Sequence, residues 1–239
     1  MLPALRFATY LAPCNRALYE YAASVCGAGS LVVGGDWREL ADGEVDVAFV
    51  CSPPLIWLDG AIEAIAAPVL RDPRFGGRPL YTSEVVVAAG SDYESFADLR
   101  GSRWAINEPS SWSGYWVTLR EVGDWSFFGE VVKAGFHQRA LRMVAGGNVD
   151  ASAIDCQVLA IELANDPSLR ERIRILATLG PAPSQPIVVR SGLPGDVKAE
   201  LRERLLALDG PVLARHQVKG FAAAPDYSAI AAVVGPVPP

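Results

Sequence analysis

A serine-rich turn is the segment of this sequence with the greatest capacity for chemistry. Residues 107–115 read Asn-Glu-Pro-Ser-Ser-Trp-Ser-Gly-Tyr, and the apolar spacing predicts a helix that begins at Gly114. A turn of this kind at a helix N-terminus offers unpaired backbone N–H groups, hydroxyls and the positive end of the helix dipole, which together suit a tetrahedral oxyanion. Serine also commonly caps helices, so Ser111 or Ser113 acting only as a cap remains an alternative.

Two further polar residues could act with this turn. His137 could donate a hydrogen bond to an oxyanion, or it could be a structural hydrogen-bonding group. Asp155 ends a predicted strand at a cleft-facing position, or it caps the helix that begins at Gln157. With Ser111 or Ser113, these residues supply the types of a hydrolytic triad. The sequence has no G-x-S-x-G elbow, so it does not favour triad hydrolysis.

The cysteine and histidine residues have no metal-binding or redox spacing. The four cysteines form no C-x-x-C pair, and only two histidines could join them, at His137 and His216. Zinc and dithiol sites require closely spaced ligand pairs. We therefore expect no metal and no cofactor, and we expect the cysteines to be core residues. They are Cys14, Cys26, Cys51 and Cys156.

The composition indicates a folded protein with a small ligand rather than a polyanionic one. Of the 239 residues, 51% are hydrophobic and 20% are charged, a balance that can build a core. The 21 Lys and Arg residues against 27 Asp and Glu residues give a net charge of −6. Because nucleic-acid binding needs a basic footprint, we expect no nucleic-acid partner.

The sequence has no apolar run near the roughly 20 residues that span a bilayer, so we expect no membrane insertion. Residues 1–10 lack a basic segment and a continuous apolar region, because Arg6 interrupts the apolar stretch. As the sequence stands, this predicts no signal peptide and a cytoplasmic protein. The location becomes periplasmic or extracytoplasmic if a leader was removed or the start is misassigned.

Alternating β-rich runs and helical segments predict an α/β protein. The stretch from Val45 to Leu70 is interpreted as a strand, a turn and a helix. Strands are expected at 5–10, 30–33, 46–51, 83–89, 102–107, 151–155, 173–178 and 186–190, and helices at 15–27, 37–42, 95–100, 114–122, 137–145, 157–165 and 194–208.

Two extended segments bracket the middle of the chain and are predicted to cross between two lobes. They are residues 81–90 and 181–190, each a β-rich run beside a Gly- or Pro-containing stretch. This arrangement predicts a discontinuous lobe I at 1–83 and 188–239, and an inserted lobe II at 84–187, with the ligand cleft between the lobes.

Several stretches together resemble the phosphonate/phosphite substrate-binding proteins of ABC transporters, and the resemblance spans nearly the whole chain. Beyond residues 80–115, they are Gly43–Phe49, the histidine-bearing Ala134–His137, Val144–Ala151, the returning segment Pro183–Arg190, and Lys219–Phe221 with Tyr227 as a closing helix. The resemblance implies a two-lobe type II periplasmic-binding-protein fold. In that fold, each lobe is a central mixed sheet flanked by helices, and two crossover strands form the hinge.

The resemblance also implies a set of ligand-binding residues. Trp112 replaces the threonine of the family's usual Ser-Thr-Ser-Gly turn, and Gln157 and Gln185 stand where aminoalkyl-phosphonate binders place carboxylates, so a cationic amine would find weaker partners here. The implied ligand-binding residues are Trp37, Ser52, Tyr81, Ser111, Trp112, Ser113, Gly114, His137, Asp155 and Gln185.

The function that follows is a non-catalytic solute-binding protein that closes on a small anionic or polar ligand, of the phosphonate, phosphite or phosphate type. We expect a monomer that is either the substrate-binding component of an ABC transporter, with the permease as its partner, or a cytoplasmic relative of such a component. One alternative is a cytoplasmic enzyme on the same fold, similar to the menaquinone-pathway dehydratases and lyases. Another is a stand-alone ligand-sensing effector module.

Overall fold

The computed structural model describes residues 2–237 of the chain, which divide into two units. Unit 1 is built from two separate stretches, residues 2–80 and 183–236. Unit 2 is built mainly from the intervening stretch, Tyr81–Ala182. The chain therefore enters unit 2 at the start of one strand, β5 (Leu80–Ala88), and leaves it at the end of another, β9 (Ile173–Pro183).

Unit 1 contains a mixed six-stranded sheet with the order β11-β4-β10-β3-β1-β2. Strand β1 is parallel to both β2 and β3, whereas β10 runs antiparallel to β3 and β4. The central strands are short, buried apolar runs, which is the pattern expected of strands covered on both faces. The bounds are β1 Phe7–Thr9, β2 Leu31–Val33, β3 Val47–Phe49, β4 Ile62–Leu70, β10 Ile187–Arg190 and β11 Val218–Ala223.

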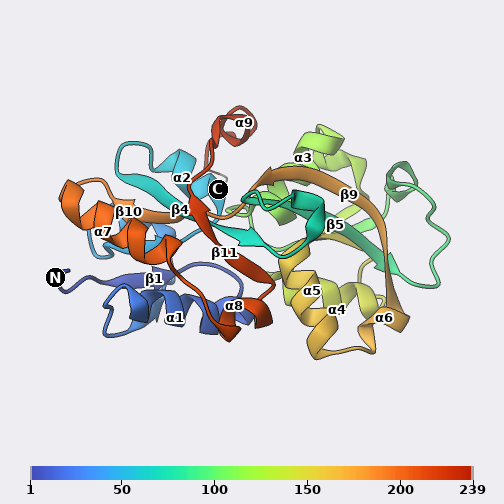
Figure 1. The fold of residues 1–239 in the computed structure, drawn as a ribbon. Helices are drawn as coiled ribbons and strands as arrows, with labels where there is room; N and C mark the ends of the chain where they lie inside the picture. The colour runs from blue at the N-terminus through green and yellow to red at the C-terminus, as the bar shows by residue number, and fades with distance from the viewer. Residues whose placement is uncertain (1, 238–239) are drawn as a thin grey trace. The chain divides into compact units, whose positions relative to one another are not determined.

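Helices cover both faces of the unit 1 sheet. In Figure 1, α1 (Arg16–Val25) and α8 (Pro211–Arg215) lie below the sheet, and α2 (Ser52–Trp57) and α9 (Ser228–Ala231) lie above it. The long helix α7 (Gly195–Leu206) contacts α1, β4 and β11. Three short 3₁₀ helices complete the unit: η1 Pro13–Asn15, η2 Trp37–Leu40 and η3 Pro73–Phe75.

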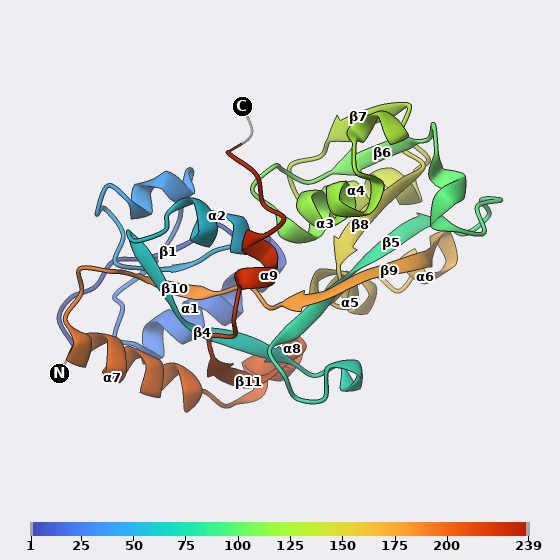
Figure 2. The ribbon, with the colours of Figure 1, turned by 90° about the horizontal axis from the view of Figure 1, so that it is seen from above.

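Unit 2 contains a mixed five-stranded sheet with the order β7-β6-β8-β5-β9, drawn at the right of Figure 2. Strand β6 is parallel to β7 and β8, and β5 is antiparallel to β8. The remaining strands are β6 Arg103–Ile106, β7 Glu130–Lys133 and β8 Ala151–Asp155. The helices are η4 Phe96–Leu99, η5 Trp112–Trp116, α3 Val117–Val122, η6 Trp125–Phe127, α4 His137–Ala145, α5 Cys156–Asn165 and α6 Leu169–Arg172.

The α/β class and the two sheets flanked by helices confirm the fold class expected from the sequence, but two predicted helices are wrong. The helix predicted to run towards Leu70 is the short α2, which ends at Trp57, followed by strand β4. Lys219–Phe221, expected in a closing helix, lies in strand β11. In both places, pairing within the sheet overrides a local sequence that contains good helix formers.

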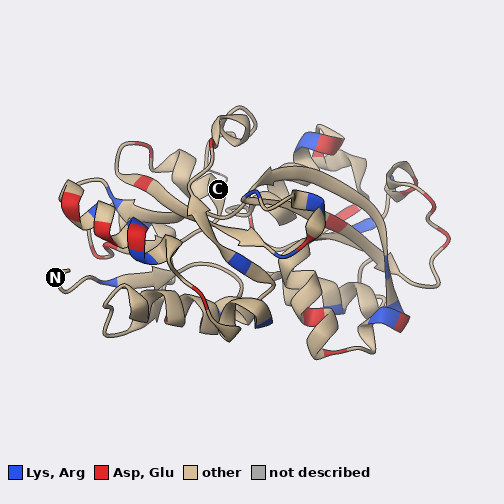
Figure 3. Ribbon diagram, viewed as in Figure 1, with Lys and Arg blue, Asp and Glu red and all other residues tan. Residues whose placement is uncertain are grey.

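Acidic and basic residues are interspersed over the described ribbon, and helix α7 carries both signs (Figure 3). Its Arg204 Nη2 lies 2.5 Å from Glu200 Oε1 one turn away. Between residues 2 and 237, no helix is both long enough and apolar enough to cross a bilayer. The same residues contain no group of three or more His, Cys, Asp or Glu side chains that could hold a metal ion.

Candidate functional site

The topology of unit 2 gathers its polar residues at one edge of the sheet. Asn107 directly follows β6, the loop after β7 leads to His137, and Asp155 ends β8. These three strands are parallel, so their carboxyl ends share an edge. Strand β5 is antiparallel to β8, and its first residues lie at that edge because Ser83 pairs with Asp155. Ligands in α/β proteins bind at this kind of edge.

Ser111 is the N-cap of helix η5, as one of the two interpretations of the turn predicts. Its Oγ accepts a hydrogen bond of 3.1 Å from the backbone N–H of Gly114. Capping occupies a lone pair of the oxygen and leaves the hydroxyl hydrogen for another acceptor. The Oγ of Ser113 lies 3.5 Å from that of Ser111, and both side chains are buried. A capping role and a ligand-donor role are therefore compatible in this residue.

His137 connects the serine turn to the end of β6. Its Nε2 lies 2.9 Å from Ser113 Oγ and 3.3 Å from Asn107 Nδ2. Burial lowers the pKa of His137 to about 4, against which a backbone interaction with Ala153 acts in the opposite direction. The imidazole is therefore neutral at pH 7, so it holds the Ser113 hydroxyl through hydrogen bonding and without charge. Its low basicity makes it a poor general base at that pH.

Gly114 is required at its position because of a close approach by Asn107. An added Cβ at Gly114 would lie 2.6 Å from Asn107 Cγ and 3.1 Å from His137 Cε1, and closer still to Asn107 Oδ1. The Asn107 side chain is buried, and its Oδ1 has no hydrogen-bond partner within the described part of the chain. The sequence analysis did not single out Asn107. Its position as the first polar residue after a buried strand was the available signal.

The other predicted residues of unit 2 have different surroundings. Asp155 caps α5, since its Oδ1 accepts hydrogen bonds from the backbone N–H groups of Gln157 at 2.7 Å and Val158 at 3.2 Å. Trp112 is buried, with the Arg120 guanidinium 5.8 Å from its ring centroid. Tyr81 is buried near the start of β5.

Unit 1 holds the remaining three predicted residues. Ser52 is fully buried at the first position of α2, and Gln185 is half-buried shortly before β10. Because β10 is antiparallel to β3, both residues lie at the edge where β3 ends. Trp37 is half-buried against Trp57, with ring centroids 5.2 Å apart. The Trp57 indole Nε1 in turn donates to the carbonyl of Gly235 at 2.8 Å.

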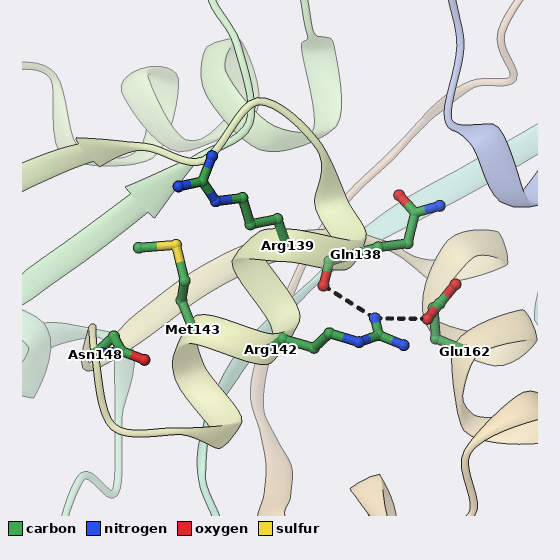
Figure 4. A pocket seen from close by; sticks show the side chains of 6 residues that line it. All are labelled: Gln138, Arg139, Arg142, Met143, Asn148 and Glu162. Atoms are coloured by element: carbon green, nitrogen blue, oxygen red, sulfur yellow. Dashed lines mark hydrogen bonds and ion pairs between the residues drawn. The ribbon is translucent and has the colours of Figure 1, made fainter.

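The structure therefore links Ser111, Ser113, Gly114 and His137 directly and places Tyr81 and Asp155 at the same edge of unit 2. A separate depression in unit 2 lies over α4 and α5 (Figure 4). There Arg142 bridges Glu162 Oε2 at 2.8 Å and the Gln138 carbonyl at 3.1 Å, while Arg139 extends away from that pair. The ion pair satisfies the charges of Arg142 and Glu162. None of the predicted ligand-binding residues lines the depression.

Comparisons with known proteins show the family of the chain. Residues 37–228 match the family described as "ABC transporter, phosphonate, periplasmic substrate-binding protein". A binding-protein component of an ABC phosphonate transporter from Pseudomonas aeruginosa has a similar structure, with a TM-score of 0.77 and 18% identity over 95% of this chain and 83% of that one.

Two further solved structures were determined with anions bound. PhnD1 from Prochlorococcus marinus, in complex with methylphosphonate, has a TM-score of 0.80 and 16% identity over 96% of each chain. A Xanthomonas citri protein bound to ATP has a TM-score of 0.74 and 20% identity over 97% of each chain. These similarities confirm the periplasmic-binding-protein fold that the sequence predicted.

Proposed function

Since the chain belongs to the family of periplasmic, phosphonate-binding substrate-binding proteins of ABC transporters, we propose that its own ligand is a small phosphonate without a cationic group. Methylphosphonate, which PhnD1 binds, is an example of such a phosphonate. The ligand would be held by hydrogen bonds from the serine turn and delivered to a transporter permease.

One observation carries the proposal: the buried Ser111, Ser113 and His137 side chains lie together at the carboxyl edge of unit 2. The Ser111 hydroxyl can donate to an oxygen of an anion, and the Ser113 hydroxyl can do so in the tautomer in which His137 Nε2–H donates to its Oγ. Such charge-assisted hydrogen bonds are stronger than neutral ones. The neutral His137 fixes the position of Ser113 without adding charge. A hydrogen-bonded, uncharged set of donors suits a small oxyanion that must bind and be released.

Two glutamines support the exclusion of aminoalkyl phosphonates. Gln157 is buried at the start of α5, and Gln185 is half-buried at the edge of unit 1. By resemblance, these positions hold carboxylates in relatives that bind a ligand amine. An amide has no net charge, so it is a weaker partner than a carboxylate for an ammonium group. We therefore expect methylphosphonate to bind more tightly than its aminomethyl analogue.

We also propose that the protein binds without catalysis and acts as a monomer, and that it is periplasmic like its family. The capped Asp155 and the weakly basic His137 support the absence of catalysis. The family is one of transport proteins, in which the ligand is released unchanged.

The test is calorimetric titration of the purified protein with methylphosphonate, phosphite, phosphate and aminomethylphosphonate, with phosphorus NMR of each compound before and after incubation. We expect saturable binding of methylphosphonate, weaker binding of its aminomethyl analogue and unchanged NMR spectra. No binding of methylphosphonate would refute the phosphonate proposal. A new phosphorus signal would instead indicate an enzyme.

A further inference from the structure

Two buried serine hydroxyls in unit 1 have no hydrogen-bond partner among residues 2–237. They belong to Ser52 and Ser184, each with 0% exposure. Buried hydroxyls are nearly always hydrogen-bonded, because burial removes them from water and leaves the lost hydrogen bonds uncompensated. An alanine at either position would avoid that cost. The two orphaned hydroxyls therefore require an explanation that lies outside the protein chain.

The topology brings these two serines to the same end of one strand pair. Strands β3 and β10 are antiparallel, with Ile187 opposite Phe49, and the Val50 N–H still donates to the Pro186 carbonyl at 3.3 Å. Continuing the register outward by two residues on each chain reaches Ser184 and Ser52. This is the carboxyl edge of unit 1, the position where α/β sheets bind ligands.

The backbone of Ser184 is held firmly although its hydroxyl has no partner. Its N–H donates to the Pro79 carbonyl at 2.9 Å, and its carbonyl accepts from the buried Tyr227 hydroxyl at 2.7 Å. Ser52 is positioned by the first turn of α2. Both hydroxyls are thus carried on fixed backbone, and preorganised donors lose little entropy when a ligand binds.

We propose that Ser184 is a further ligand-binding residue, and that its hydroxyl and that of Ser52 form a pair that donates hydrogen bonds to the oxygens of the oxyanion. This inference rests on the proposed function and concerns donors that unit 1 carries. A tetrahedral oxyanion has several oxygens, each able to accept more than one hydrogen bond, so it can accept from both hydroxyls.

Ser102 provides a matched control, because it is a third buried serine whose hydroxyl has no partner in the described structure. It precedes β6, so it lies at the opposite edge of the unit 2 sheet from Asn107. Its backbone is bonded to Leu99 and Gly129. Replacing Ser102 by Ala therefore removes an orphaned hydroxyl away from the proposed site.

The experiment measures methylphosphonate affinity by calorimetry and stability by urea unfolding for Ser52→Ala, Ser184→Ala, Ser184→Cys and Ser102→Ala. We expect each of the first two substitutions to weaken binding about ten- to a hundredfold without loss of stability. Ser184→Cys, which keeps a weak donor, should bind with intermediate affinity. Ser102→Ala should bind like the wild type.

Unchanged affinity in Ser184→Ala and Ser184→Cys would overturn the inference, and a loss of stability with it would identify a buried water as the partner instead. If only Ser52→Ala loses affinity, the proposal that Ser52 and Ser184 act as a pair fails. If the wild type itself does not bind methylphosphonate, the proposed function fails, and the inference falls with it. Binding by the wild type with no effect of Ser184 rejects the inference alone.

Discussion

Replacing Gly114 by Ala sets two physical effects of opposite sign against each other. Gly114 lies within helix η5 and has no left-handed backbone, so helix propensity alone predicts that Ala stabilises the protein by about 1 kcal/mol. The new Cβ, however, would lie 2.6 Å from Asn107 Cγ, and the buried amide would have to move. Overpacking of this kind costs about 1–3 kcal/mol, and loss of the Asn107–His137 hydrogen bond adds about 1 kcal/mol.

The steric effect is the larger one, so we expect Gly114→Ala to lower the free energy of unfolding by about 1–3 kcal/mol in urea titrations. Because the displaced amide and imidazole position Ser113, methylphosphonate affinity should also fall about tenfold. Gly90→Ala is the control, since a Cβ there meets nothing within 4 Å. In an Asn107→Ala background, which provides the missing space, Gly114→Ala should become neutral or stabilising. If Gly114→Ala alone is as stable as the wild type, the close approach of Asn107 to Gly114 is refuted.

Three other predictions follow from the contacts at the site and in the unit 1 sheet. Ser111→Ala should cost about 1 kcal/mol of stability, measured in urea, because its hydroxyl caps η5, and it should also cost ligand affinity if that hydroxyl donates to the ligand as proposed. Ser113→Ala should reduce affinity more than stability, and normal calorimetric affinity in both variants would remove the turn from the site. For His137, the folded-state pKa of about 4 lies below the usual 6.5, so the unfolded chain binds the proton more readily and stability falls as pH decreases from about 6.5 towards 4. Between pH 7 and pH 5, urea titrations should show the wild type losing about 2 kcal/mol more than His137→Gln, and equal losses would contradict the burial of a neutral imidazole. Finally, Asp46→Asn should destabilise unit 1 by about 2 kcal/mol, because the buried carboxylate accepts from Arg6 Nε at 3.0 Å and Arg190 Nη2 at 3.2 Å; an unchanged urea midpoint would show that these ion pairs contribute nothing.

The sequence predicted the elements whose periodicity is clear and missed those that depend on tertiary pairing. Strand β8 (Ala-Ser-Ala-Ile-Asp) and helix α4 have the predicted bounds, because glycines and polar residues precede the short strand and the helix is clearly amphipathic. Strand β4 reads Ile-Glu-Ala-Ile-Ala-Ala-Pro-Val-Leu, and its alanines suit a helix equally well. Only pairing with β10 and β11 fixes it as a strand, and that pairing involves residues more than a hundred positions away.

Local sequence could predict which residues have polar chemistry, but not which of them meet. The serine turn and His137 were identified by residue type, and the structure joins them through the Ser113–His137 contact. Asn107 was missed because its role depends on the close packing against Gly114, which has no local pattern. Ser184 was missed because an orphaned hydroxyl is a property of the folded environment alone.

The tryptophan at position 112 removes a hydroxyl from the serine turn. In the family to which this chain belongs, the central turn usually carries a threonine at this position, so the tryptophan removes one of three neighbouring hydroxyls. The indole does not occupy an exposed place in exchange, because Trp112 is 2% exposed, with its ring under the Arg120 guanidinium. Unit 2 is therefore left with two serine hydroxyls, at Ser111 and Ser113, for the proposed oxyanion, which can accept more. On this reasoning, Trp112→Thr should raise the affinity for methylphosphonate measured by calorimetry, because it adds a hydroxyl to the turn. No gain in affinity would show that the missing threonine hydroxyl does not limit binding.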